Sequence, residues 1–117
     1  MSNTKINYLY RDANNFKVHN EAVIEGLLTE QQMDDIINCL DEGEYFVPSA
    51  VSLPECKFDK YDPEADHPWF ELYRDGFETT NNAPTVNVTA EELYQLFKKC
   101  DCHWKAIAGE KDEEGTL

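Results

Sequence analysis

The pattern of hydrophobic and polar positions predicts a β-hairpin at the start of the chain. Two segments, 5–11 and 16–25, alternate between apolar and polar side chains, and a period of two is typical of strands with one buried face. Residues 12–15 between them are polar and favour a turn. The side chains that we expect to face the core are Ile6, Tyr8, Tyr10, Phe16, Val18, Ala22 and Ile24.

Two later segments show the period of amphipathic helices. Thr29 and Gln32 match a capping box, in which the threonine oxygen accepts from the third helical amide and the glutamine side chain reaches back. Thr89 and Glu92 repeat the pattern, and Gly43 is suited to the left-handed residue that ends the first helix. The apolar stripes are Met33, Ile36, Ile37 and Leu40 in the first helix and Leu93, Leu96, Phe97 and Cys100 in the second.

The region between the helices contains shorter strand signals. Residues 45–54 are apolar but interrupted by Pro48 and Pro54, so we expect a short edge strand or an extended segment there. Segments 69–73 and 77–80 have the residue types of strands, and the Asp-Gly dipeptide between them is a hairpin turn signal. These two segments are therefore expected to pair with each other.

The elements together predict an α+β fold. Residues 84–88 offer one more strand, so four to five short strands in an antiparallel sheet give the two helices a surface to cover, in the order β-β-α-(β)-β-β-(β)-α. A chain of 117 residues is enough for one domain. We place this domain at 1–104 and expect 105–117, which is largely polar, to be a flexible tail.

Charge adds a functional clue. The chain has 24 acidic and 10 basic residues and a formal net charge of -14 at pH 7. Between Lys17 and Lys57 there is no lysine or arginine, yet nine carboxylates lie there: Glu21, Glu25, Glu30, Asp34, Asp35, Asp41, Glu42, Glu44 and Glu55. Because this field repels phosphates and anionic lipid, we expect a basic protein surface as partner, and neither direct nucleic acid nor a membrane.

Seven carboxylates are the predicted partner-binding residues: Glu21, Glu25, Glu30, Asp34, Asp41, Glu42 and Glu44. On a helical wheel Glu30, Asp34 and Asp41 share a narrow arc, about 6 Å and about 10 Å apart along the axis. That spacing is of the order of the phosphate repeat of a nucleic-acid strand, so the row is suited to a nucleic-acid-binding groove on another protein. The alternative is a solvated acidic face that only keeps the protein soluble.

A second acidic group suggests a divalent metal. Asp62, Glu64 and Asp66 match the first, third and fifth positions of a calcium loop, but His67 stands where that loop needs glycine and Tyr73 where it needs glutamate. We therefore expect no metal there. A divalent-metal-binding protein or small hydrolase that uses Asp62, Glu64, Asp66 and His67 is kept as the alternative function.

Cysteine chemistry is a weaker candidate. Cys100, Cys102 and His103 lie close together and Cys39 or Cys56 could complete a zinc site, but structural zinc usually has two such pairs. Cys100 also falls on an apolar stripe, where a thiol behaves as a small hydrophobe, so no cofactor is expected. Without a signal sequence or a long apolar run, and with this cysteine spacing, we expect a cytoplasmic protein.

Motifs for catalysis are missing from the sequence. Its three serines, Ser2, Ser49 and Ser52, lie in no nucleophile elbow, and no phosphate-binding glycine loop or metalloprotease helix is present. A histidine next to a carboxylate, without a nucleophile or an oxyanion device, is not a mechanism. We therefore predict that the protein is not an enzyme.

Three segments carry a resemblance to known proteins: 8–12 (YLYRD), 40–48 (LDEGEYFVP) and 66–72 (DHPWFEL). They resemble small acidic proteins of bacterial phages and mobile elements, over roughly residues 5–100. No activity is assigned to those proteins, so the resemblance transfers no functional residue. It implies a setting in which small acidic proteins block host defence nucleases, as anti-restriction and anti-CRISPR proteins do.

Overall fold

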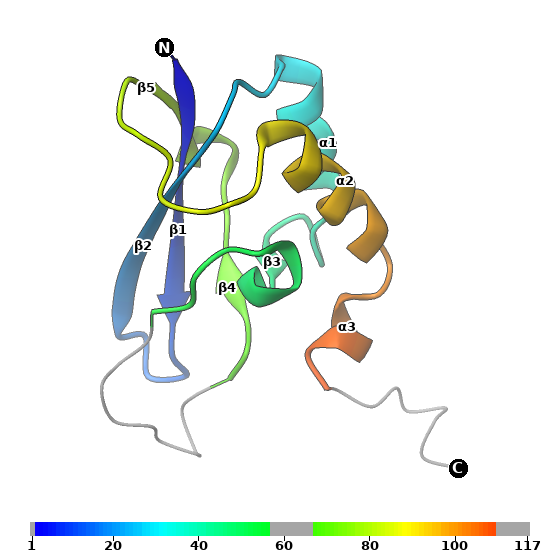
Figure 1. The fold of residues 1–117 in the computed structure, drawn as a ribbon. Coiled ribbons are helices and arrows are strands. Elements are labelled where there is room, and N and C mark those ends of the chain that lie inside the picture. Colours follow the sequence, from blue (N-terminus) through cyan, green and yellow to red (C-terminus); the bar gives the residue numbers. More distant parts are fainter. Residues whose placement is uncertain (1, 57–66, 110–117) are drawn as a thin grey trace.

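The structure is a computed structural model and describes residues 2–56 and 67–109. Helices lie on one face of a five-stranded antiparallel sheet, which makes two layers (Figure 1). The strands are β1 (Asn3–Arg11), β2 (Lys17–Ile24), β3 (Tyr45–Phe46), β4 (Phe70–Glu71) and β5 (Phe77–Thr80); the helices are α1 (Glu30–Cys39), α2 (Ala90–Cys100), the short α3 (Trp104–Ile107) and the 3-10 turns η1 (Pro48–Val51) and η2 (Arg74–Gly76). The predicted α+β class is confirmed.

The first two strands form the predicted hairpin. They pair antiparallel from Arg11 opposite Lys17 to Thr4 opposite Ile24. The turn closes through a hydrogen bond from the Asp12 amide to the Phe16 carbonyl. The even-numbered side chains of β1 are buried against the helices, as the alternation predicts. Among the residues expected to face the core, Phe16 is the exception at 65% exposed, because it lies in the connection between β1 and β2.

The predicted hairpin between the fourth and fifth strands is wrong. Both strands pair with β1 and not with each other. Strand β4 pairs with residues 9–10 of β1, β5 pairs with residues 3–6, and η2 connects the two strands. Gly76 lies where a Cβ atom would come within 2.5 Å of the Asn7 carbonyl oxygen. The glycine is therefore needed for close approach to β1, and not for a two-residue hairpin turn.

The two main helices begin as predicted but the first ends early. Both capping boxes form, at Thr29 and at Thr89. Helix α1 ends at Cys39, so Asp41 lies in the following turn and not on the helix. Gly43 is left-handed, with a φ of 70°, but it belongs to the turn that leads into β3.

Of the two remaining strand predictions, the one for 84–88 is wrong and the one for 45–54 is confirmed. Residues 84–88 form no strand, because the Thr85 hydroxyl, and not a backbone carbonyl, accepts from the Val23 amide at 2.9 Å. The short edge strand expected within 45–54 forms as β3, which has two residues and is followed by η1.

The chain packs back onto the helices at its C-terminal end. Trp104 is 2% exposed, and its indole Nε1 donates to the Cys39 carbonyl at 2.6 Å. Helix α3 thus continues to Ile107, past residue 104 where we placed the end of the domain. Within the described ranges, no helix has both the length and the apolar character needed to cross a membrane.

Candidate functional site

The predicted row of anions on α1 is partly compensated. Arg74 of η2 donates from Nε to Asp34 Oδ1 at 2.8 Å and pairs through Nη2 with Glu30. The hydrogen bond with Asp34 is the main cause that raises the pKa of Arg74. Since Asp41 is not on the helix, the three expected carboxylates do not form one free row.

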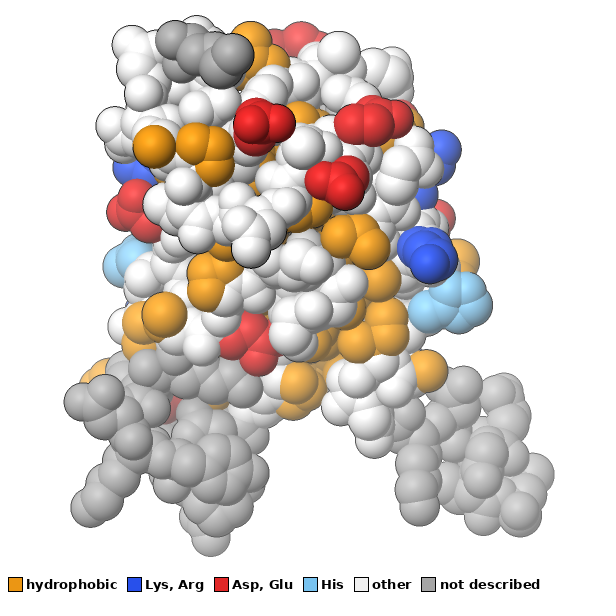
Figure 2. Space-filling model, in the orientation of Figure 1, with side chains coloured by type: hydrophobic (Ala, Val, Ile, Leu, Met, Phe, Trp, Pro, Cys, Tyr) orange, Lys and Arg blue, Asp and Glu red, His pale blue; other side chains and the backbone are white. Residues whose placement is uncertain are grey.

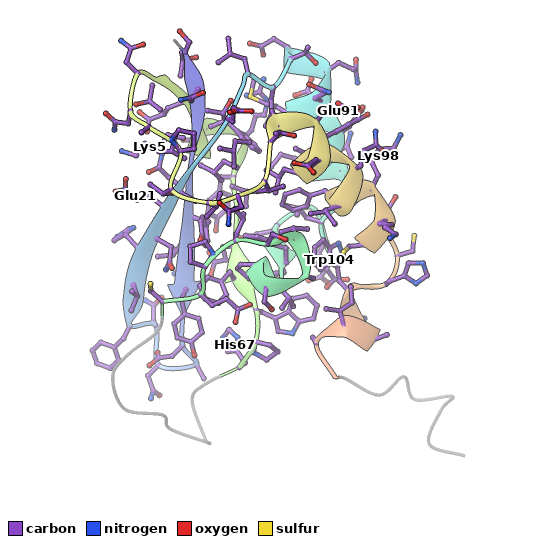
Figure 3. All side chains as sticks on the ribbon, in the orientation of Figure 1. Lys5, Glu21, His67, Glu91, Lys98 and Trp104 are labelled. Carbon is purple, nitrogen blue, oxygen red and sulfur yellow. The ribbon has the colours of Figure 1, made fainter. Side chains whose placement is uncertain are left out.

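The two predicted carboxylates near β2 lie in different settings. Glu21 is on the sheet face turned away from the helices, 3.5 Å from the Nζ atom of Lys5 (Figure 3). The Glu25 carbonyl accepts from the Ala90 amide at 2.8 Å, while its side chain is exposed and has no ion-pair partner among the residues that the structure describes. Only Glu25 of this pair is open to an external cation.

The turn after α1 presents the remaining predicted carboxylates beside aromatic rings. Asp41 and Glu42 line a hollow of about 400 Å³ together with Tyr45, Trp69, His67 and Lys105. The rings of Tyr45 and Trp69 meet at 68°, with centroids 6.4 Å apart. Neither carboxylate has an ion-pair partner within the described ranges. Carboxylates beside aromatic faces are a favourable setting for a cation.

The field at this hollow is negative. The charge of Glu44 is the first cause that raises the pKa of Tyr45, followed by burial and the charges of Glu71 and Glu42. Lys105 lines the same hollow but forms no ion pair with Asp41 in the described structure. The hollow therefore attracts positive groups.

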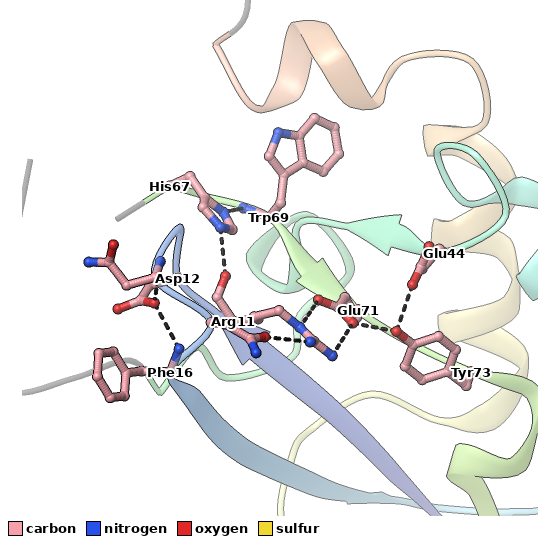
Figure 4. A network of polar contacts seen from close by, with 10 residues as sticks. Arg11, Asp12, Phe16, Glu44, His67, Trp69, Glu71 and Tyr73 are labelled. Carbon is pink, nitrogen blue, oxygen red and sulfur yellow. Dashed lines mark hydrogen bonds and ion pairs between the residues drawn. The ribbon is translucent and has the colours of Figure 1, made fainter. Parts of the chain in front are cut away.

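Glu44 takes part in a network that the sequence did not reveal (Figure 4). Arg11 donates to the buried Glu71 through Nε at 2.9 Å and Nη2 at 3.3 Å. The Tyr73 hydroxyl contacts both Glu71 and, at 2.6 Å, Glu44. Burial, followed by these two carboxylates, raises the pKa of Tyr73. The network fixes the end of the 41–44 turn to the sheet.

His67, a weak metal candidate, is fully used by hydrogen bonds. Its Nδ1 accepts from the Trp69 amide at 3.1 Å, so the proton is on Nε2, which donates to the Arg11 carbonyl at 2.7 Å. Neither nitrogen is open to a metal or a substrate. Asp62, Glu64 and Asp66, the other candidates of this loop, lie outside the described residues.

The cysteines give no metal centre in the described ranges. Cys39 and Cys100 are buried, which raises the pKa of both thiols and favours the form that does not bind zinc. Cys56 and Cys102 are exposed. No group of three histidine, cysteine or acidic side chains in residues 2–56 and 67–109 is placed to hold an ion.

Comparison of the chain with protein-family models, with curated proteins and with solved structures gives no match. The resemblance to proteins of phages and mobile elements therefore remains a prediction. The structure and the net charge define the chain only as an acidic α+β protein.

Proposed function

We propose that this protein is a non-catalytic interaction module that binds a basic surface of another protein. The observation that carries the proposal is the hollow beside the 41–44 turn, where Asp41 and Glu42 lie next to two aromatic rings and form no ion pair in the described structure, with Lys105 at the same hollow included. A lysine or arginine side chain of a partner fits this chemistry, because it gains both charge attraction and ring contact.

The partner that we propose is a nucleic-acid-acting host defence protein, blocked as anti-restriction or anti-CRISPR proteins block theirs. The net charge of -14 and the resemblance described above support this proposal. The contact differs from the one that the helical wheel suggested. Because Arg74 forms ion pairs with Glu30 and Asp34, the Asp41–Glu42 turn is the better candidate for the first contact.

A pair of matched variants tests the proposal. Asp41→Asn with Glu42→Gln removes two charges from the hollow, and Glu21→Gln with Glu25→Gln removes two charges elsewhere. The protein is used as bait in a lysate of its native host, with washes of rising salt and with added DNA as competitor. We expect the first variant to lose the captured basic proteins at lower salt than the second.

The comparison has a clear opposite outcome. Equal loss of capture by the two variants would mean that only the overall charge matters, so the proposed contact at the hollow would be wrong. Captured proteins that are acidic, or that DNA does not displace, would contradict the choice of a nucleic-acid-binding surface.

A further inference from the structure

A second hollow, larger than the one beside the 41–44 turn, lies along α2. It has a volume of about 910 Å³ and runs between the helix and the segments 52–54 and 86–88. Its accessible apolar lining includes Pro54, Val86 and Leu96, and the buried Leu53 and Val88 lie beneath them. Figure 2 shows apolar side chains in the middle of this face with acidic side chains above them. An open apolar groove of this size is a usual place for a ligand or a partner segment.

The two ends of the groove carry opposite charges. Glu91 and Glu92 line it at the first turn of α2 and Lys99 lines it in the last turn. Glu92 and Lys99 are seven residues apart and share one helix face, about 10 Å apart along the axis. None of the three has an ion-pair partner in the part of the chain that the structure describes.

The acidic end is held in place by the protein itself. Glu91 accepts from Gln32 of α1 at 3.0 Å and from Gln95 at 3.2 Å. Glu92 accepts from the Thr89 amide at 3.0 Å in the capping box. These bonds fix the carboxylates without neutralising them, so the groove offers a preformed negative end.

We propose that this groove binds a short amphipathic helix of a partner protein, packed antiparallel to α2. In that direction the acidic N-terminal turn of the partner helix meets Lys99 and its basic C-terminal turn meets Glu91 and Glu92. Helices favour this distribution of charge on their own, because it complements the macrodipole. Apolar side chains of the partner then lie on the accessible side chains of Pro54, Val86 and Leu96, as in other helix-in-groove complexes.

This docking surface is separate from the hollow at Asp41 and Glu42, so the two proposals stand or fall independently. The test uses two synthetic helical peptides of identical composition with leucines on one face. One has glutamate in its first turn and lysine two turns later, and the other has these two residues exchanged. Both are stapled on the opposite face so that their helicity, checked by circular dichroism, is equal.

Binding is measured by titration calorimetry and by amide shifts of the labelled protein. We expect the first peptide to bind about three- to tenfold more tightly, because two solvent-exposed charge pairs are gained. The Glu91→Lys, Lys99→Glu double variant keeps the net charge and spares the capping box. It should remove the preference for the first peptide, because the end where Glu92 stays becomes neutral and the other end becomes acidic. Gln95→Trp, which fills the groove from an exposed position, should weaken binding of both peptides.

Several results would overturn the proposal. Equal affinity of the two peptides, or no binding of either at 1 mM peptide, on the order of the weakest specific complexes, would remove the basis for an antiparallel helix. Shifts confined to the 41–44 turn would place the peptide on the other surface. An unchanged preference in the double variant would show that the charged ends do not orient the partner.

Discussion

At the scale of single residues, Tyr73 is in an unusual position. It has one hydroxyl hydrogen, yet its oxygen lies within hydrogen-bonding distance of Glu71 and Glu44 (Figure 4). The hydroxyl can donate to only one of them at a time. Arg11 supplies the positive charge that lets Glu71 stay buried beside a second carboxylate.

We predict that Tyr73→Phe lowers the free energy of unfolding by about 0.5 kcal/mol, the low end for a lost hydrogen bond, because solvent screens this site. The side chain is 42% exposed, which justifies the low value. Urea denaturation at neutral pH measures the change. A variant as stable as the wild type would show that the hydroxyl contacts do not contribute.

Stability should also fall in alkaline solution. The pKa of Tyr73 and that of the buried Tyr8 are raised, mainly by burial in both cases. Above about pH 10, the ordinary pKa of tyrosine, the unfolded chain releases these protons while the folded chain keeps them, so folding is disfavoured as pH rises.

The measurement is urea denaturation between pH 9 and pH 11, about one pH unit on each side of the ordinary tyrosine pKa, with the absorbance of tyrosinate followed in parallel. Tyr73→Phe serves as the control and should lose less stability over the same interval. A free energy of unfolding that stays constant, or that rises with pH, would contradict the assignment.

At the scale of elements, α1 and α2 are joined by polar contacts beside their apolar stripes, among them the bond from Gln32 to Glu91 and a second bond from Tyr94. The Tyr94 hydroxyl donates to Asp35 at 2.7 Å, and this bond is the main cause that lowers the pKa of Asp35. A lowered pKa stabilises the fold above the ordinary pKa of about 3.9, and this contribution is lost as pH falls through the folded value.

We predict that Tyr94→Phe raises the pKa of Asp35 toward its ordinary value. The acid-induced loss of stability that this residue causes should then become smaller. A carbon-detected NMR titration of the Asp35 carboxyl group gives the pKa directly, with Glu92 as an internal reference. No movement of the Asp35 titration would show that Gln31, the second donor, dominates.

Helix α3 contributes one side chain that holds the C-terminal end of α1. We predict that Trp104→Phe costs about 1–3 kcal/mol, because the ring stays buried while the Cys39 carbonyl loses its donor. Chemical denaturation measures the cost. If Trp104→Phe were neutral, water would have to reach that carbonyl.

The elements that the sequence predicts are those with local signals. The capping boxes at Thr29 and Thr89 and the alternation in β1 each involve residues close in sequence, and all of them form. The pairing of β4 and β5 with β1, and that of Arg74 with α1, depend on residues far apart in sequence. No local pattern encodes such contacts, so the free acidic row was predicted where a cation in fact lies.

The same limit applies to the two candidate surfaces. Asp41 and Glu42 were predicted for their charge. The rings beside them come from different parts of the chain, because Tyr45 is in β3 and Trp69 directly precedes β4. The groove along α2 is formed by three separate segments of the chain. Both surfaces become visible only once the chain has folded.

At the scale of the whole molecule, the net charge matters less than where it is left uncompensated. We predict that Arg74→Gln, which releases Glu30 and Asp34, strengthens binding to polylysine at low salt. Lys17→Gln changes the net charge equally but breaks no ion pair of the described structure, so its effect should be smaller.

The two affinities are compared over a series of salt concentrations, because exposed charges are screened at high ionic strength. Equal gains by the two variants would indicate that the polycation senses only total charge. A weaker complex for Arg74→Gln would mean that the released carboxylates are not accessible.

The central place of β1 has a consequence for biosynthesis. This strand is synthesised before β5, yet Asn3 pairs with Thr80, so part of its edge stays unpaired until residues 77–80 have been made. Until then the β1–β2 hairpin exposes unpaired backbone N–H and C=O groups along that edge, and such an edge can pair with other chains. Translation that stops before residue 80 should therefore yield fragments that self-associate instead of folding.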